Sequence, residues 1–191
     1  MTDFRALKKQ LRLEALARRD RLGTDDRIEA AMGLAERAGD LGIPPGSVVS
    51  GYWPMRSEMD VRPLMFALMQ QGCRLCLPAI LDKTTIEFRE LVRGVDMVPM
   101  GFGTIGPGED AEVMDPQIML MPLAAFDARG NRIGYGAGYY DRAIARLGEA
   151  RPRLIGVAFE CQEVEAVPDE PHDQKLDALL SESGLREFAP V

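Results

Sequence analysis

The feature that most constrains the fold of this chain is the alternation of short apolar runs with segments of helical spacing. The runs expected to form strands are residues 47–53, 73–77, 86–91, 118–121 and 154–159. Strands that alternate with helices are typical of α/β proteins with a parallel sheet. We therefore predict an α/β fold over residues 1–191, a single domain with a mostly parallel central sheet flanked by helices.

The first expected helix combines an apolar stripe with a basic face. Asp3 is placed to cap it, and Gly23 is expected to end it. Lys8 and Arg12 are four residues apart, so they share a face beside the stripe. The stripe predicted to face the rest of the protein consists of Phe4, Leu7, Leu11 and Leu16.

Local signals also place the other helices and the loops. Thr24 is expected to cap a second helix, and Pro63 suits the first turn of a third that ends at Gly72. A fourth helix is expected at about 139–147. Residues 99–116 are rich in glycine and are predicted to form a long loop of functional importance. The spacing of Leu176, Leu179 and Leu180 fits a helix or a short strand.

Composition limits the classes of partner. The net charge is −7 and there is one His, which argues against non-specific nucleic-acid binding and against metal sites with two His ligands. No run of 18 apolar residues and no signal peptide stand out, so we expect a cytoplasmic protein without membrane contact. Residues 1–22 differ from the rest, with seven basic and three acidic side chains. This basic helix is either a solvated face or an arm for an anionic ligand.

The three cysteines, Cys73, Cys76 and Cys161, fit a reducing compartment. Cys73 and Cys76 have the spacing of a zinc or redox pair, but they lie in a strand, where positions i and i+3 point to opposite faces. No second pair completes four ligands. Buried thiols are therefore the favoured interpretation.

The stretch from Pro122 to Arg142 carries the strongest chemical signal. It runs from a strand end through alternate glycines into a helix, where backbone N–H groups can bind an anion. Arg132 and Arg142 bracket it with guanidinium groups suited to phosphate. It lacks the Gly-Lys-Ser/Thr of a Walker loop, and Tyr139 stands at the third glycine position of the dinucleotide fingerprint. A tight strand-to-helix turn without a ligand is the alternative.

Two carboxylates accompany this stretch. Asp141 falls in the first turn of the fourth helix, and Asp173 follows His172 in a proline-rich loop. Carboxylates beside a phosphate cradle suit Mg²⁺, which takes its remaining ligands from phosphate and water. The alternatives are a capping role for Asp141, a surface position for Asp173, and a structural or catalytic His172.

Residues 131–142 resemble the signature of the 5-formyltetrahydrofolate cyclo-ligase family, also called methenyltetrahydrofolate synthetase. Five further blocks occur in the order that the family shows. They are Lys8-Lys-Gln-Leu-Arg12, the loop from Tyr52 to Asp60 with Glu58, Leu77-Pro78, the strand Gly156-Val-Ala-Phe159, and the segment from Gln162 to His172-Asp173.

The resemblance implies ATP- and Mg²⁺-dependent conversion of 5-formyltetrahydrofolate to 5,10-methenyltetrahydrofolate, on a fold like that of sugar-phosphate isomerases and CoA-transferases. It implies Arg132 and Tyr140 as catalytic residues and Asp141 and Asp173 as Mg²⁺ ligands. Implied ATP contacts are Lys8, Lys9, Arg12, Arg132, Gly134, Tyr135, Gly136, Ala137, Gly138, Tyr139 and Tyr140. Implied folate contacts are Trp53, Glu58, Tyr135, Gly136, Ala137, Gly138 and Tyr139.

The glycine loop departs from the family pattern. Some members carry Lys or Gly where Ala137 stands and a basic residue where Tyr135 stands, so the phosphate contacts of this loop are expected to differ. Three other hypotheses about the function remain: a related enzyme with another substrate, an isomerase or transferase that uses no ATP, and a non-catalytic binding module. The expected state is a monomer or a weak homo-oligomer.

Overall fold

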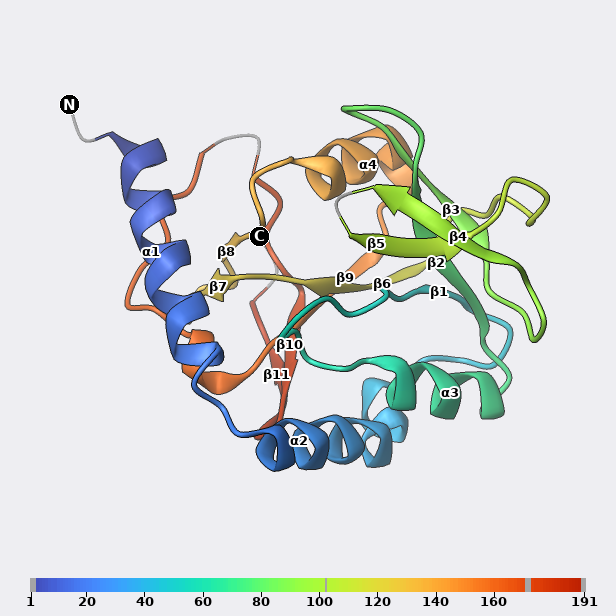
Figure 1. The fold of residues 1–191 in the computed structure, drawn as a ribbon, viewed down its shortest axis with the longest axis horizontal. Coiled ribbons are helices and arrows are strands. Elements are labelled where there is room, and N and C mark those ends of the chain that lie inside the picture. The colour runs from blue at the N-terminus through green and yellow to red at the C-terminus, as the bar shows by residue number, and fades with distance from the viewer. Residues whose placement is uncertain (1–2, 102, 171–172, 190–191) are drawn as a thin grey trace.

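A computed structural model describes residues 3–101, 103–170 and 173–189. A central sheet lies between helices (Figure 1). Its strands, in spatial order, are β11 (Gly184–Glu187), β10 (Ala178–Ser181), β9 (Arg153–Val157), β6 (Ile118–Pro122), β1 (Val48–Ser50), β2 (Arg74–Ile80) and β3 (Ile86–Glu90). The helices are α1 (Phe4–Arg19), α2 (Thr24–Glu36), α3 (Arg62–Gln70) and α4 (Tyr139–Leu147), with the short 3-10 helices η1 (Ala38–Leu41), η2 (Gly148–Ala150) and η3 (Glu160–Gln162).

The sheet is mostly parallel, as predicted. β10, β9, β6, β1 and β2 run parallel to one another, and only the edge strands β11 and β3 are antiparallel to the strands beside them. The chain moves from β1 to β2 on one side and returns to β6 on the other. The carboxyl ends of β1 and β6 therefore flank a topological switch point, where ligands of α/β sheets bind.

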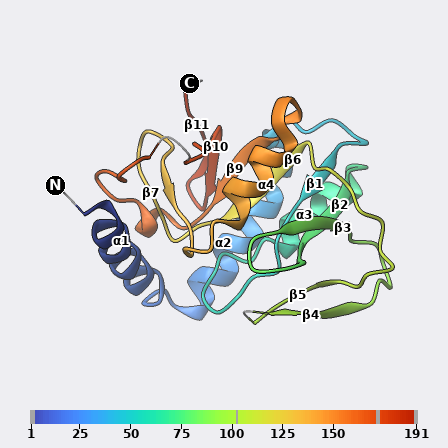
Figure 2. The ribbon, with the colours of Figure 1, turned by 90° about the horizontal axis from the view of Figure 1, so that it is seen from above.

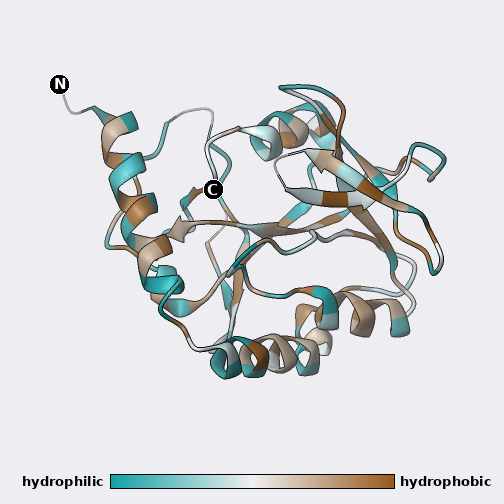
Figure 3. Cartoon of the chain, viewed as in Figure 1, coloured by the Kyte–Doolittle hydropathy of each residue, from teal (hydrophilic) through white to brown (hydrophobic). Residues whose placement is uncertain are grey.

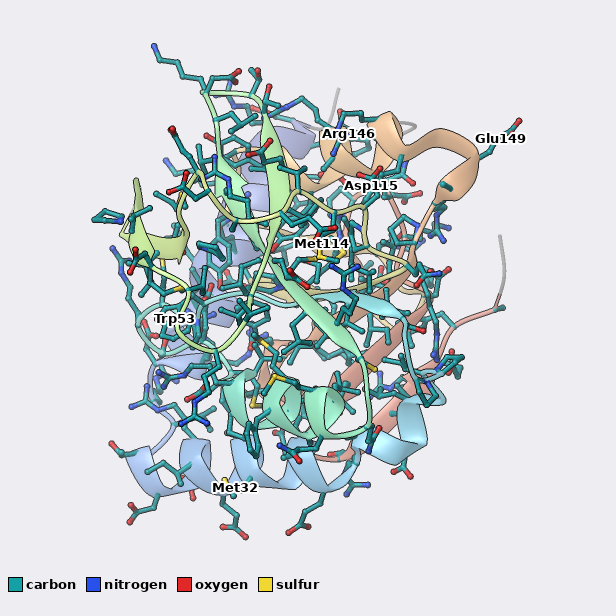
Figure 4. All side chains as sticks on the ribbon, turned by 90° about the vertical axis from the view of Figure 1, so that its right-hand side faces the viewer. Met32, Trp53, Met114, Asp115, Arg146 and Glu149 are labelled. Atoms are coloured by element: carbon teal, nitrogen blue, oxygen red, sulfur yellow. The ribbon has the colours of Figure 1, made fainter. Side chains whose placement is uncertain are left out.

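Apolar side chains cover both faces of the sheet. α2 and α3 pack on one face through residues such as Leu34 and Leu64, and α4 packs on the other through Ile144. Figure 3 shows the apolar residues along the strands and α3. α4 is also tied to the segment before β6 by Arg146, which lies 3.8 Å from Asp115 (Figure 4).

Cys73 and Cys76 point into these two different cores, as the strand geometry predicted. Both are free thiols, and burial raises the pKa of Cys76 to about 12. A thiol with a raised pKa is mostly protonated at neutral pH and is a poor nucleophile or metal ligand.

α1 lies against the edge of the molecule, beside the hairpin of β7 (Ala125–Phe126) and β8 (Arg132–Ile133) (Figure 2). Asp3 caps it as predicted and accepts hydrogen bonds from the backbone of Arg5 and Ala6. The predicted apolar stripe is only partly correct, because Phe4 is 44% exposed. Instead, one face of the helix with Lys8, Arg12, Ala15 and Arg19 meets the body of the protein.

Several predicted boundaries change because pairing partners decide them. β2 continues through Pro78, which was expected to end it. In the pairing of β2 with β3, Leu91 N donates to Leu75 O, and Pro78 lies opposite Phe88. Phe88 O accepts from Met114 N instead, so the pairing needs no N–H donor at Pro78. Its nitrogen faces the side where β1 has already stopped at Ser50. β1 itself is shorter than the predicted strand.

The predicted loop 99–116 is partly a hairpin of β4 (Met97–Gly101) and β5 (Thr104–Pro107). The leucine-rich tail forms β10 and not a helix. α2 begins at Thr24 with Gly23 as its N-cap residue, so Thr24 does not cap it. Among the described residues, no helix is long and apolar enough to span a membrane.

Candidate active site

The β7–β8 hairpin that leads into the glycine-rich loop is held by one buried carboxylate. Asp127 is fully buried and accepts hydrogen bonds from Asn131 N and Nδ2, both at 3.1 Å. It also accepts one from Val167 N at 2.9 Å and pairs with Arg129. Burial alone would raise the pKa of Asp127, but these hydrogen bonds outweigh burial and lower it. The start of the loop is therefore fixed to Val167.

The glycines of the loop supply two left-handed backbone positions. Gly136 has φ 100° and Gly138 has φ 66°. Among the described residues, Arg56 is the one non-glycine residue with positive φ, so Ala137 causes no such backbone strain. Gly138 precedes α4, and the loop ends where the helix N–H groups begin.

Arg12 reaches this loop from α1. Its Nε donates to Gly134 O at 2.7 Å. A Cβ atom added to Gly136 would lie 3.7 Å from Arg12 Nη2, so the guanidinium lies directly beside the backbone of the loop. A permanent positive charge thus sits next to a glycine-rich turn at a helix N-terminus, which is the arrangement of an anion site.

Arg142 holds the other side of the loop. Its Nη2 donates to Ala137 O at 2.6 Å and its Nε donates to Thr84 O at 2.7 Å. Tyr139 lies under the same guanidinium and donates to Asp82 O at 3.1 Å. The turn between β2 and β3 is thereby fixed to the start of α4.

Lys8 and Arg132 form three ion pairs with carboxylates of this region. Lys8 Nζ lies 2.6 Å from Asp173 Oδ2 and 2.9 Å from Glu170 Oε2. Burial alone would lower the pKa of Lys8, but the hydrogen bonds to Asp173 and Glu170 outweigh burial and raise it. Arg132 Nη2 donates to Asp141 Oδ1 at 2.8 Å. Gln174 N also approaches this oxygen, at 3.3 Å, so Asp141 lies close to the segment that carries Asp173.

Arg132 and Tyr140 lie deeper in the site. The Arg132 side chain is 6% exposed, and its Nε has no hydrogen-bond partner in the part of the chain that the structure describes. Burial raises the pKa of Tyr140 well above its usual range, and the charge of Glu58 raises it further, whereas Arg132 opposes the shift. Tyr140 is therefore a neutral phenol at physiological pH and can donate a hydrogen bond.

Glu58 occupies a tight turn after β1. Its backbone N donates to Met55 O at 3.0 Å, and its Oε2 accepts from Met55 N at 2.8 Å. Arg56, inside this turn, has φ 53°, a conformation that costs a side-chain-bearing residue free energy. Glu58 is 8% exposed. The turn thus presents a mostly buried carboxylate whose own backbone restrains it.

The sequence model of the 5-formyltetrahydrofolate cyclo-ligase family matches residues 5–182, which is most of the chain. The chain belongs to the 5-formyltetrahydrofolate cyclo-ligase family.

Individual members of the cyclo-ligase family show the same relationship. The chain is 31% identical over 136 residues to 5-formyltetrahydrofolate cyclo-ligase of Haemophilus influenzae, covering 68% of this chain and 72% of that protein. It is 28% identical over 146 residues to the Escherichia coli K12 protein, covering 73% and 80%. The NMR structure of 5,10-methenyltetrahydrofolate synthetase from Aquifex aeolicus superimposes with a TM-score of 0.76 at 27% identity, over 97% of this chain and 94% of that one. The predicted family and fold class are thus confirmed.

The structure brings most of the residues suggested by the cyclo-ligase resemblance into one region. Lys8 and Arg12 on α1 meet the loop 134–138 and the segment with Asp173, and Arg132 meets Asp141. Tyr135 and Tyr140 both lie close enough to Glu58 for its charge to raise their pKa values, after burial as the main cause.

Other suggested residues make contacts with different parts of the chain. Tyr139 points to Asp82, and Lys9 is exposed one residue along α1 from Lys8, on a different side of the helix. Trp53 is half-buried on the segment after β1, under the guanidinium of Arg62 at 5.3 Å (Figure 4). His172 lies outside the described residues.

Sequence reasoning missed two polar residues of this region, Arg19 and Ser57. Arg19 is 4% exposed and Ser57 is 6% exposed, and the two are hydrogen-bonded. The signal was present in the spacing, because Lys8, Arg12 and Arg19 recur at i, i+4 and i+11 and so share one helix face. Following the basic residues as a stripe, and not the leucines alone, would have found Arg19.

Proposed function

We propose that this chain is an ATP-dependent ligase that closes 5-formyltetrahydrofolate to 5,10-methenyltetrahydrofolate, with release of ADP and phosphate. The reaction takes place beyond the carboxyl ends of β1 and β6. The observation that supports this site best is the contact of Arg12 with Gly134 and Gly136, 122 residues or more away in the sequence. It places a cationic helix against a glycine-rich loop, which is the arrangement that the phosphates of a nucleoside triphosphate require.

ATP phosphates would lie between α1 and the loop 134–138. Arg12 is already held against the loop, and Lys8 lies four residues away on the same face of the helix. The Lys8 ammonium is now paired with Asp173 and Glu170. A phosphate would compete with these carboxylates for it, so nucleotide binding includes an exchange of partners at Lys8.

The residues present fit a magnesium ion that arrives with ATP. Among the described residues no group of three His, Cys, Asp or Glu side chains is placed to hold a metal. Mg²⁺ bound with a nucleotide needs only one or two carboxylates, because phosphate oxygens and water complete its shell. Asp141 and Asp173, with side chains 25% and 23% exposed, would hold it. When bound, the ion neutralises charge on the phosphates.

The chemistry needs positioning and charge neutralisation more than a protein nucleophile. The formyl oxygen attacks the γ-phosphorus of ATP, a new P–O bond forms, and the bond to ADP breaks. N10 of the folate then attacks the formyl carbon and loses its proton. The C–O bond breaks, phosphate leaves with the former formyl oxygen, and the carbon bridges N5 and N10. A formyl oxygen is a poor leaving group, and phosphorylation corrects this.

Arg132 and Tyr140 are the catalytic residues of this proposal. The buried guanidinium of Arg132 would stabilise the negative charge on the transferring phosphoryl group. Tyr140 keeps its proton, because its pKa is raised, and would donate a hydrogen bond to a reacting oxygen. Its role is that of a donor and not of a general base.

The folate would bind beside Glu58 and Trp53. A carboxylate accepts hydrogen bonds from two N–H groups on one edge of a pterin, and Glu58 is held in a fixed turn for this purpose. Trp53, five residues earlier on the same segment, would add an aromatic surface. We also propose that residues 1–191 act as one catalytic domain in the cytoplasm, as a monomer or a weak homo-oligomer.

A direct assay tests the function. Purified protein is mixed with ATP, Mg²⁺ and 5-formyltetrahydrofolate, and the near-ultraviolet absorbance of the methenyl product is followed. A rise that needs both ATP and Mg²⁺ is expected. If folded protein at high concentration gives no such rise, the chain does not catalyse this reaction.

Three variants test the site. Asp141→Asn should reduce turnover and raise the Mg²⁺ requirement, Lys8→Ala should raise the KM for ATP, and Glu58→Gln should raise the KM for the folate. Losses of about tenfold or more are expected for each. Arg5→Ala removes a positive charge from the exposed side of α1 and is the control. If Lys8→Ala behaves like Arg5→Ala, the assignment of the phosphate site is wrong.

A further inference from the structure

The last turn of α1 contains a buried cation that no step above uses. Arg19 is 4% exposed. Its Nε donates to Ser57 Oγ at 3.0 Å and its Nη1 donates to the Tyr135 hydroxyl at 2.7 Å. A buried guanidinium is costly unless it is well hydrogen-bonded, so its placement calls for an explanation.

Both partners of Arg19 border the proposed folate site. Ser57 directly precedes Glu58 in the tight turn after β1. Tyr135 belongs to the glycine-rich loop, and the charge of Glu58 acts on its hydroxyl. One side chain of α1 thus holds two segments that are 78 residues apart, Ser57 and Tyr135.

The direction of the hydrogen bonds shows which protons Ser57 and Tyr135 still have to donate. Ser57 donates its only proton to Asp20, so it can accept from Arg19. The Tyr135 hydroxyl likewise accepts from Arg19, which leaves its own proton to be donated elsewhere. Tyr135 as a whole is 42% exposed, but desolvation at its hydroxyl is the main cause of its raised pKa, and Glu58 adds to it, so the hydroxyl stays protonated. Glu58 is the carboxylate whose side chain acts on this hydroxyl.

We propose that Arg19 is a positioning residue for folate recognition, which fixes the Glu58 carboxylate through Ser57 on one side and Tyr135 on the other. This inference rests on the proposed function, because Glu58 is taken as the residue that binds the pterin. Arg19 itself touches neither the folate nor the ATP in this proposal. It restrains the turn that presents Glu58 and the tyrosine that orients it.

The shape of the arginine side chain suits this task. Its Nε and Nη1 point in different directions from one rigid plane, so they reach two partners on separate segments at the same time. A lysine keeps the charge but presents one flexible ammonium. Arg19→Lys should therefore retain part of the effect and Arg19→Gln should lose it.

Arg18 provides a matched control on the same turn of α1. Its Nε donates to Cys161 O at 2.6 Å and its Nη2 donates to Glu163 O at 2.9 Å. Arg18 therefore anchors α1 through two hydrogen bonds, as Arg19 does, but to backbone of the η3 region and not to the folate site. A purely structural role would make Arg18→Gln and Arg19→Gln alike.

The experiment compares binding constants in the full-length chain. Dissociation constants for 5-formyltetrahydrofolate and for ATP are measured separately by titration calorimetry, together with kcat and each KM, for wild type, Arg18→Gln, Arg19→Gln, Arg19→Lys, Tyr135→Phe and Glu58→Gln. Arg19→Gln should weaken folate binding about tenfold or more while ATP binding changes less than about twofold. Arg19→Lys should fall between it and wild type, and Arg18→Gln should leave folate binding within about twofold of wild type.

A double-mutant cycle isolates the link to Glu58. If Arg19 acts through Glu58, the Arg19→Gln/Glu58→Gln protein should bind folate about as weakly as Glu58→Gln alone. Additive losses, or equal losses in Arg18→Gln and Arg19→Gln, would overturn the proposal. Absence of turnover in the wild type would instead contradict the proposed function. Normal turnover in the wild type with normal folate binding in Arg19→Gln would contradict the positioning role alone.

Discussion

Single charged residues in this protein join segments that are far apart in the sequence, through hydrogen bonds. Asp127 is the clearest case, since one carboxylate joins the β7–β8 turn to Val167. Its folded-state pKa is lowered: burial acts to raise it, but hydrogen bonds from Val167, Arg129 and Asn131 prevail. A carboxylate with a lowered pKa stabilises the fold above its unfolded pKa, and that stability is lost as the pH falls through the folded pKa.

Asp127→Asn should therefore destabilise the protein most at neutral pH. The expected loss in the free energy of unfolding is about 3 kcal/mol at pH 7, because a buried hydrogen-bonded charge is removed. The difference from wild type should shrink as the pH falls below about 4. Urea unfolding between pH 7 and pH 2.5 measures it. Arg129→Ala, which removes the exposed partner, should cost less than about 1 kcal/mol, and a pH-independent difference for Asp127→Asn would contradict the assignment.

At the scale of elements, local signals predicted most helices and fewer strand ends. α4 begins and ends where the sequence indicated, because Gly138 and Gly148 flank it. Strand ends depend on a neighbour: β2 passes through Pro78 because its nitrogen faces the side where β1 has ended. The hairpin β4–β5 was missed because its strands contain Pro and Gly, which weigh against a strand in isolation.

A pair of glycines tests the energetics of two elements. Gly33 lies in α2 at a position where an added Cβ meets nothing within 4 Å. Gly33→Ala should stabilise the protein by about 1 kcal/mol, because alanine favours helices. Gly130, in the β7–β8 turn, has φ 80° and a Cβ there would lie 3.0 Å from Leu176 O. Gly130→Ala should destabilise the protein by more than about 1 kcal/mol. Thermal unfolding measures both, and shifts of the same sign would contradict this reading.

For the whole molecule, the attachment of α1 is the decisive feature. Only Ala15 and Arg19 of this helix are buried, and the helix is held by arginine donors to carbonyl and hydroxyl oxygens. Little apolar area stabilises it, so it should open more easily than the sheet. The same helix carries Lys8 and Arg12 toward the proposed phosphate site, which couples its docking to nucleotide binding.

Hydrogen exchange should show this coupling. Backbone amides of α1 are expected to exchange faster than those of β6 and β9 in the protein without ligand, and to slow when MgATP is added. Arg18→Gln should speed exchange in α1 and leave β6 unchanged. If α1 and β6 exchange at one common rate in all samples, the helix does not open separately, and its docking is part of global unfolding.

The sequence alone determined the alternation of strands and helices, the glycine-rich loop before α4, and the family to which the chain belongs. These features are local, because periodicity and turn residues act over a few positions. Only the tertiary structure decided that the basic face of α1 docks, that Lys8 pairs with Asp173, and that Arg19 holds Tyr135. These contacts join residues more than 100 positions apart, and their geometry follows from how the helix packs against the hairpin and not from any local pattern.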